Sequence, residues 1–346
     1  MSLYGMALII SLNQSENVNL IRELKMLRNN PVAEMLATAS TIVLDGALAT
    51  ELEARGCDLT DPLWSAKVLI ENPALIYQVH LDYFNAGAQC AITASYQATP
   101  LGFKARGLSE RQSLELIKKS VQLAAQARDE YRRTHPQAAT LLIAGSVGPY
   151  GAYLADGSEY RGDYALPQAE MMDFHRPRIS ALLDAGVDLL ACETMPSFAE
   201  IKALAELLKE FPQALAWFSF TLRDSAHLSD GTPLKEVLSL LNLCPQVVAV
   251  GINCIALDNV TAALTQLSDG TSLPLVVYPN SGEHYDAATK TWDNHGDSAC
   301  SLAAHLPEWR AAGAKLIGGC CRTTPADIAG IARFCQHAGK ESADEC

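Results

Sequence analysis

The chain alternates eight times between short apolar runs and longer stretches with helical spacing of their apolar residues. Such alternation predicts parallel strands joined by right-handed helical crossovers. Eight units predict a closed, single-domain (β/α)8 barrel of the TIM type, an α/β fold, and the alternative is an open doubly wound sheet. The predicted strands are 41–44, 90–94, 141–144, 188–191, 216–221, 247–252, 273–278 and 314–317, and the predicted helices are 74–86, 109–131, 169–185, 198–211, 234–243, 260–267, 301–312 and 325–337.

The length of 346 residues, with 49% hydrophobic side chains, suits one large core. We expect residues 1–28 to form a peripheral N-terminal extension, residues 29–337 to form the barrel and residues 338–346 to form a C-terminal tail. The apolar segment 3–12 lacks the basic flank and the small-residue cleavage site of a secretory signal.

A net charge of −13 disfavours nucleic acid and anionic membrane surfaces as partners. No apolar run approaches the roughly 20 residues that cross a bilayer. The ten cysteines do not show the dense pattern of a small secreted scaffold, and reduced thiols fit them better. We therefore expect a cytoplasmic protein that acts on small molecules.

Polar residues follow most of the predicted strands. Active sites of (β/α)8 barrels are built at the carboxyl ends of their strands, so these residues are expected to converge on one face. They include Asp45-Gly46, Glu193-Thr194, Asn253-Cys254 and Cys320-Cys321.

Three thiols on this face predict a metal site. Cys254 ends the sixth strand and Cys320 and Cys321 end the eighth, so a closed barrel separates them by one strand. Soft sulfur ligands select zinc, and three of them leave a fourth position open. We expect one Zn²⁺ per chain. An iron–sulfur site with Cys192 as a fourth ligand, or thiols that bind nothing, are the alternatives.

Three anionic ligands favour activation of a substrate thiol over acidification of water, so alkyl transfer to sulfur is the expected reaction. A zinc hydrolase or lyase, or a metal-binding protein without catalysis, stays open at this point.

Several motifs together resemble the zinc-dependent homocysteine S-methyltransferases, in particular the bacterial enzymes that use S-methylmethionine. The resemblance covers roughly residues 29–334. It rests on Asp45-Gly46-Ala47, Glu51-Leu52-Glu53-Ala54-Arg55-Gly56, Thr93-Ala94-Ser95-Tyr96-Gln97, Gly145-Ser146-Val147-Gly148-Pro149, Cys192-Glu193-Thr194, Gly251-Ile252-Asn253-Cys254, Tyr278-Pro279-Asn280-Ser281-Gly282-Glu283 and Gly318-Gly319-Cys320-Cys321-Arg322-Thr323-Thr324-Pro325.

The resemblance implies how the acceptor is bound. The three cysteines are then zinc ligands, with the homocysteine sulfur as the fourth. Asp45 and Glu193 would bind the ammonium group, and backbone N–H groups from Gly46 onward would meet the carboxylate. Asp45 could instead cap a turn or helix, and Asn253 could bind a ligand or only hold its own turn.

The resemblance also implies a sulfonium methyl donor, either S-methylmethionine or S-adenosylmethionine, between which the sequence does not choose. Trp64 and Tyr96 align with aromatic residues that contact the cationic donor in the betaine branch of the family, and tyrosines of the loop 149–166 could complete this aromatic box. His284 and His295 lie in another long loop, where solvated histidines are the commoner case. The chain ends soon after its last helix, without the extension of the betaine branch, which favours a monomer.

Overall fold

The computed structural model describes residues 29–59, 63, 65–281, 284–286, 291–293 and 302–341. Eight parallel strands form one sheet in the order β1-β12-β9-β8-β5-β4-β3-β2. A parallel bridge between Leu44 and Cys90 joins β1 to β2 and closes the ring. The prediction of a (β/α)8 barrel is confirmed, and the open sheet is wrong. The strands are β1 (Ile42–Val43), β2 (Cys90–Ile92), β3 (Leu142–Val147), β4 (Leu189–Met195), β5 (Ala216–Phe220), β8 (Val247–Asn253), β9 (Leu275–Tyr278) and β12 (Ala314–Ile317).

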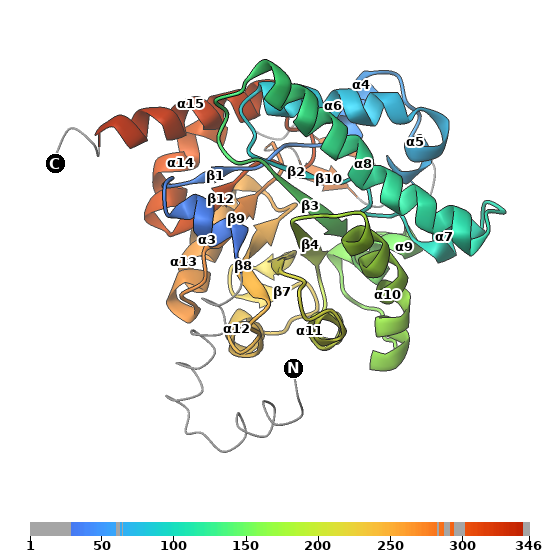
Figure 1. Cartoon of the computed structure of the whole chain (residues 1–346). Coiled ribbons are helices and arrows are strands. Elements are labelled where there is room, and N and C mark those ends of the chain that lie inside the picture. Colours follow the sequence, from blue (N-terminus) through green and yellow to red (C-terminus); the bar gives the residue numbers. More distant parts are fainter. Residues whose placement is uncertain are drawn as a thin grey trace.

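Helices surround this ring on the outside (Figure 1). The longest, α8, begins at a capping box in which Ser109 and Gln112 bond each other's backbone N–H groups, and it buries Ile117, Val121 and Ala124 on one face. The last, α15, continues four residues into the predicted tail. The outer helices are α6 (Pro73–Asn85), α8 (Glu110–Thr134), α10 (Gln168–Asp184), α11 (Phe198–Leu207), α12 (Leu234–Leu241), α13 (Val260–Gly270), α14 (Leu302–Ala311) and α15 (Pro325–Glu341).

Two apolar layers hold the barrel together, because successive residues of each strand face opposite sides of the sheet. In β4, Ala191 belongs to the cluster inside the barrel, and Cys192 belongs to the layer between strands and helices. The short helix α3 (Pro31–Leu36) adds Val32 and Met35 to the inner cluster. Because α3 leads into β1, it closes the amino end of the barrel.

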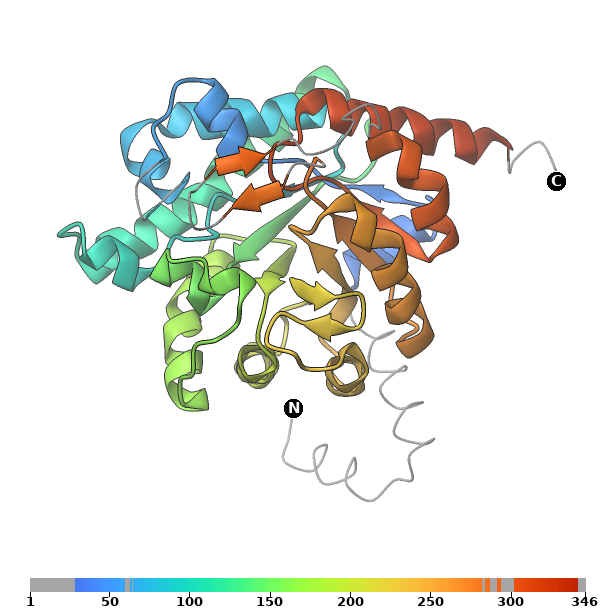
Figure 2. The same cartoon turned by 180° about the vertical axis from the view of Figure 1, so that it is seen from behind.

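The opposite end carries short elements that the sequence did not predict. Two hairpins follow β5 and β9, and Figure 2 shows both over the same end of the barrel. They are formed by β6 (Leu222–Asp224) with β7 (His227–Leu228) and by β10 (His284–Asp286) with β11 (Thr291–Asp293). The other short elements at this end are α4 (Ala49–Ala54), α5 (Ser65–Glu71), α7 (Pro100–Lys104), α9 (Tyr150–Leu154), η1 (Ser158–Tyr160) and η3 (Leu257–Asn259). A further short element, η2 (Leu208–Glu210), directly follows α11 and lies within the predicted helix 198–211.

Among the described residues, no helix is both long enough and apolar enough to span a membrane. Residues 1–28 lie outside the described part of the chain, so their peripheral role stays a prediction.

Candidate active site

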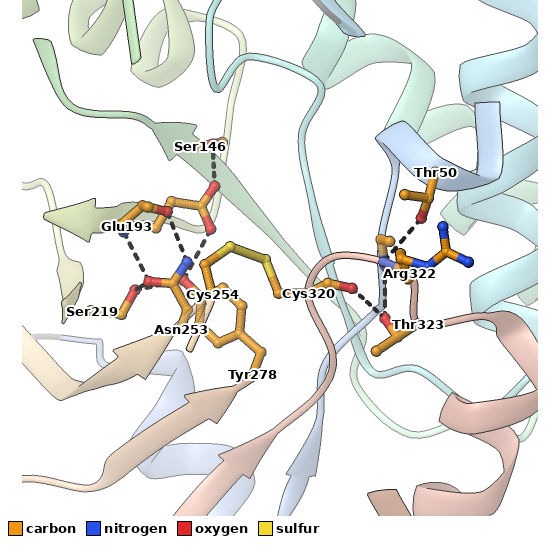
Figure 3. The surroundings of a disulfide bond; sticks show 12 residues. Thr50, Ser146, Glu193, Ser219, Asn253, Cys254, Tyr278, Cys320, Arg322 and Thr323 are labelled. Carbon is orange, nitrogen blue, oxygen red and sulfur yellow. Dashed lines mark hydrogen bonds between the residues drawn. A yellow bond between two sulfur atoms is a disulfide. The ribbon is translucent and has the colours of Figure 1, made fainter. Parts of the chain in front are cut away.

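The three cysteines predicted from the sequence lie together. Cys254 follows β8 directly, and Cys320 and Cys321 follow β12 after two glycines, with β9 between these strands. Their Sγ atoms all lie within 4.8 Å of one another. Cys254 and Cys320 are joined as a disulfide (Figure 3), with their Cα atoms 5.6 Å apart. Cys321 is a free thiol. The structure thus joins two thiols that were expected to be reduced.

The sulfur cluster fits a tetrahedral zinc ion once the Cys254–Cys320 bond is reduced. Zinc–sulfur bonds of about 2.3 Å place sulfur ligands about 3.8 Å apart, within the spread of these three atoms. Within the described chain, the group that could share one ion contains only these three residues. Cys192, the proposed fourth thiol of an iron–sulfur site, is buried in the layer between strands and helices. It faces away from the cluster, because Glu193 on the inner side is its neighbour in the strand.

The backbone around the thiols is tightly constrained. Cys254 itself has a φ of 51°, in the left-handed region that non-glycine residues rarely adopt. Gly319 leaves no room for a side chain, because a Cβ there would lie 2.4 Å from the Thr323 hydroxyl. Thr323 donates to the Cys320 carbonyl at 2.7 Å and accepts from Ala47 N at 3.1 Å. It thereby fixes the cysteine loop against the loop that follows β1.

Glu193 lies inside the barrel on β4 and is 7% exposed. Its carboxylate accepts from the hydroxyls of Ser146 and Tyr278, the latter at 3.0 Å (Figure 3). Burial raises the pKa of Glu193 to about 7, and these two hydrogen bonds act in the opposite direction. The sequence did not identify Ser146 and Tyr278 as partners, because they come from β3 and β9.

Asp45 is buried at the end of β1, and its Oδ2 accepts from Ile92 N at 2.8 Å. It therefore bonds the neighbouring strand β2, and α4 begins without a side-chain cap. Burial raises the pKa of Asp45 well above its ordinary value, and the charge of Glu193 acts in the same direction. Gly46 is required here, because a Cβ would lie 2.8 Å from both Thr323 and Tyr83.

Asn253 does not hold its own turn, which was one of its two predicted roles. Its Oδ1 accepts from Thr194 N and from Ser219 Oγ, both at 2.8 Å, and its Nδ2 donates to Thr194 Oγ1 at 2.8 Å. Thr194 has a φ of 60°, so the amide supports a strained residue directly after Glu193. Asn253 thus links three neighbouring strands beneath the site.

A cavity of about 120 Å³ lies over these residues. Its lining contains all the described site residues predicted from the sequence, namely Asp45, Gly46, Tyr96, Glu193, Asn253, Cys254, Cys320 and Cys321. A groove of about 640 Å³ lies between α7, α8 and α10, but none of the predicted site residues lines it.

The predicted aromatic box is described only in part. Trp64 lies outside the described residues. Of the two loop histidines, which do not belong to this box, His295 also lies outside them and His284 lies on β10. Of the tyrosines in the loop 149–166, Tyr160 lines the cavity beside Tyr96. The others point elsewhere: Tyr150 and Tyr153 pack against Phe174, and Tyr164 bonds Glu200.

A buried polar network that the sequence did not predict lies behind Tyr96. Arg178 of α10 donates to the carbonyls of Tyr96 and Gly148, both at 2.6 Å, and to His175 Nδ1 at 3.0 Å. His175 Nε2 in turn bonds Glu200 at 2.7 Å. A guanidinium only donates, so His175 accepts on Nδ1 and carries its proton on Nε2. The neutral imidazole agrees with burial lowering the pKa of His175.

A closed barrel with a thiol cluster and two buried carboxylates at the carboxyl ends of its strands defines a class of protein. It is a (β/α)8-barrel enzyme whose site suits a soft metal ion and a cationic substrate group. Comparisons with known proteins narrow this class.

A family model described as homocysteine S-methyltransferase matches residues 42–335. The homocysteine S-methyltransferase of Escherichia coli (strain K12) is 69% identical over 306 residues, which cover 88% of this chain and 99% of that protein. A Bacillus subtilis homocysteine S-methyltransferase is 54% identical over 311 residues, covering 88% and 98% of the two chains. The chain belongs to the homocysteine S-methyltransferase family, and it is an enzyme of the methyltransferase class.

Solved structures agree with this assignment. The metallated form of the homocysteine methyltransferase MmuM from Escherichia coli matches with a TM-score of 0.81 at 65% identity, covering 88% of this chain and 99% of that one. Its oxidized form matches with a TM-score of 0.82 at 66% identity and covers the same shares.

Proposed function

We propose that the enzyme transfers a methyl group from a sulfonium donor to the thiol of homocysteine and forms methionine. The donor is S-methylmethionine, with S-adenosylmethionine as a second compound of the same class. The observation that carries this proposal is the convergence of three thiols and two buried carboxylates on one cavity. The family membership and the names of its relatives support the choice of acceptor.

The proposed metal site consists of Cys254, Cys320 and Cys321. Zn²⁺ held by their thiolates supplies an open fourth position that keeps a substrate thiol deprotonated at neutral pH. Cys254 and Cys320 bind a metal only when their mutual bond is reduced. This requirement supports an enzyme of the cytoplasm, where thiols stay reduced.

Asp45 and Glu193 are the proposed anchors of the homocysteine ammonium group. Both carboxylates are buried, line the cavity and repel each other, so a cation between them relieves an unfavourable charge pair. The backbone from Gly46 to Thr50 lines the same cavity and is the proposed contact of the carboxylate. Asn253 acts indirectly, by holding the residue after Glu193 in place.

Tyr96, Trp64 and Tyr160 are the proposed aromatic contacts of the donor cation. The homocysteine sulfur attacks the donor methyl carbon, and the electron pair of the broken carbon–sulfur bond stays on the donor sulfur. The donor loses its positive charge, and S-methylmethionine and homocysteine each become methionine. The residues contribute mainly by position, since holding two reactants in line can contribute roughly 7–11 kcal/mol.

We further propose that residues 29–337 contain the whole site and that the enzyme is a monomer. Light scattering at assay concentration tests the oligomeric state, and a dimer would contradict this part of the proposal.

The reduced, zinc-loaded enzyme incubated with homocysteine and S-methylmethionine is expected to form two methionines per turnover. Cys320→Ser should lose both bound metal and turnover, because it removes one of three ligands. Cys244→Ser is the matched control, since this thiol lies at the amino end of β8 and bonds the Leu240 carbonyl. Full activity of a rigorously metal-free preparation would refute the proposed mechanism.

A further inference from the structure

Glu159 is a buried carboxylate in η1, on the connection between β3 and α10. The residue is 8% exposed, and its Oε2 is buried without a hydrogen-bond partner. The hydroxyl of Thr221 at the end of β5 donates to the Glu159 carbonyl at 3.0 Å and fixes the backbone there. A buried carboxylate oxygen without a partner is costly, so its presence calls for an explanation.

The neighbouring cation does not neutralise this carboxylate. Arg161 donates to Asp163 at 2.9 Å and lies 3.8 Å from Asp156, and its side chain is 48% exposed. Burial accordingly raises the pKa of Glu159 to about 7, and the charge of Arg161 only partly offsets this effect. A bound molecule with a positive charge would neutralise the carboxylate of Glu159, which the neighbouring Arg161 does not.

Glu159 is not among the residues that line the cavity, but it directly precedes one of them in the chain and its charge acts on another. The next residue, Tyr160, lines the cavity together with Tyr96. The negative charge of Glu159 raises the pKa of Tyr96, after burial the largest influence on that phenol. The same negative potential that opposes a phenolate at this position favours a cation beside the Tyr96 ring.

We propose that Glu159 is the charge partner of the cationic methyl donor and that it selects a sulfonium over a neutral thioether of similar shape. This inference rests on the proposed function and assigns the donor side of the same cavity, whereas Asp45 and Glu193 serve the acceptor. Methyl transfer leaves the donor sulfur neutral, because it keeps the electron pair of the broken bond. The product therefore carries one positive charge fewer than the donor. Its attraction to Glu159 is weaker, which favours its release.

Glu159→Gln tests this role, because it removes the charge and keeps the shape. We expect the KM for S-methylmethionine to rise at least about tenfold, as for a lost charged interaction. The KM for homocysteine should change less than about twofold, because distant sites contribute to the free energy independently of each other. The zinc content should stay constant. Asp163→Asn is the matched control: it removes one negative charge from the same loop, but its side chain is 56% exposed, and both KM values should stay unchanged.

The outcomes separate the two hypotheses. If the wild-type enzyme turns over both substrates and Glu159→Gln leaves the KM for S-methylmethionine unchanged, the charge role is wrong and the proposed function stands. An equal rise in both KM values also overturns it. If the wild-type enzyme uses neither S-methylmethionine nor S-adenosylmethionine as donor, both hypotheses fail. The melting temperature of Glu159→Gln should equal or exceed that of the wild type, since a buried unpaired charge is lost. A lower melting temperature with lost turnover would assign Glu159 to the fold instead.

Discussion

At the scale of single residues, Glu193 is buried, although its proposed role requires a negatively charged carboxylate. Its carboxylate accepts two hydroxyl hydrogen bonds, yet its pKa is raised to about 7 by burial. Only the ionised form attracts an ammonium group strongly. Ionised Glu193 therefore destabilises the free enzyme, because its charge is buried, and a bound cation offsets this destabilisation.

Replacing Glu193 by Gln is expected to raise the KM for homocysteine by about 10- to 100-fold, the range of one charged hydrogen bond. Zinc content should not change, because Glu193 is not among the thiol ligands. Metal analysis and acceptor titrations measure both quantities, with the exposed Glu210→Gln as control. An unchanged KM would show that Glu193 does not bind the ammonium group.

The pH dependence gives the same prediction a second readout. The KM for homocysteine should fall as pH rises through about 7, where Glu193 ionises, and this step should vanish in Glu193→Gln. Stability has the opposite sign. Because the folded-state pKa lies above the ordinary value of 4.5, the folded state holds the proton more tightly. This contribution to stability is complete below about pH 4.5 and is lost as pH rises through about 7.

At the scale of elements, Arg178 ties together three successive connections at the carboxyl end of the barrel. Its guanidinium holds the carbonyls of Tyr96 and Gly148, and through His175 it reaches Glu200 on α11. Glu200 also accepts from Tyr150 N at 2.7 Å. Gly148 has no space for a side chain, because a Cβ would lie 2.4 Å from the Tyr96 carbonyl. The network therefore positions Tyr96 over the cavity.

Arg178→Met is expected to lower the free energy of unfolding by about 3–5 kcal/mol, because it leaves the buried carbonyls of Tyr96 and Gly148 without their charged donor. It also removes the donor to His175 Nδ1, whose ring bonds the buried Glu200. Arg176→Met on the same helix is the matched control. Arg176 is 36% exposed and pairs with Glu210 at 2.7 Å, so its loss should cost less than about 1 kcal/mol. Urea denaturation measures both variants. An equal loss of unfolding free energy in both variants would show that the buried network stabilises the fold no more than the exposed ion pair.

The sequence predicted the eight barrel strands because each is a short run of buried, mostly apolar residues. It did not predict the hairpins β6–β7 and β10–β11, which have few apolar residues and pair only locally. The same contrast holds in the site. Cys320 and Cys321 are adjacent and recognisable, whereas Tyr278 and Ser146 act through contacts with another strand. Thr323 likewise acts through a contact with the distant loop after β1. Asn253 was recognised, but its role depends on Thr194 and Ser219, which a linear sequence does not bring together.

At the scale of the whole molecule, the two ends of the barrel have different tasks. The carboxyl end holds strained residues, buried charges and the cavity. The amino end is filled by α3, which is capped by Asn30, whose side chain accepts from Val32 N and Ala33 N. The cavity and α3 thereby lie at opposite ends of the barrel axis, and active sites of this fold are generally at the carboxyl end.

This separation predicts how far the chain can be shortened from its N-terminus. Removal of residues 1–28 should leave turnover and the melting temperature unchanged, because it keeps Asn30 and all of α3. Removal of residues 1–36 also deletes Val32 and Met35, which are 0% and 6% exposed. Losing two buried apolar side chains should cost about 3–6 kcal/mol. Urea denaturation and activity of the two truncations decide the matter. Instability of the shorter deletion would show that residues 1–28 belong to the folded barrel, whereas equal stability of both would mean that α3 does not support its amino end.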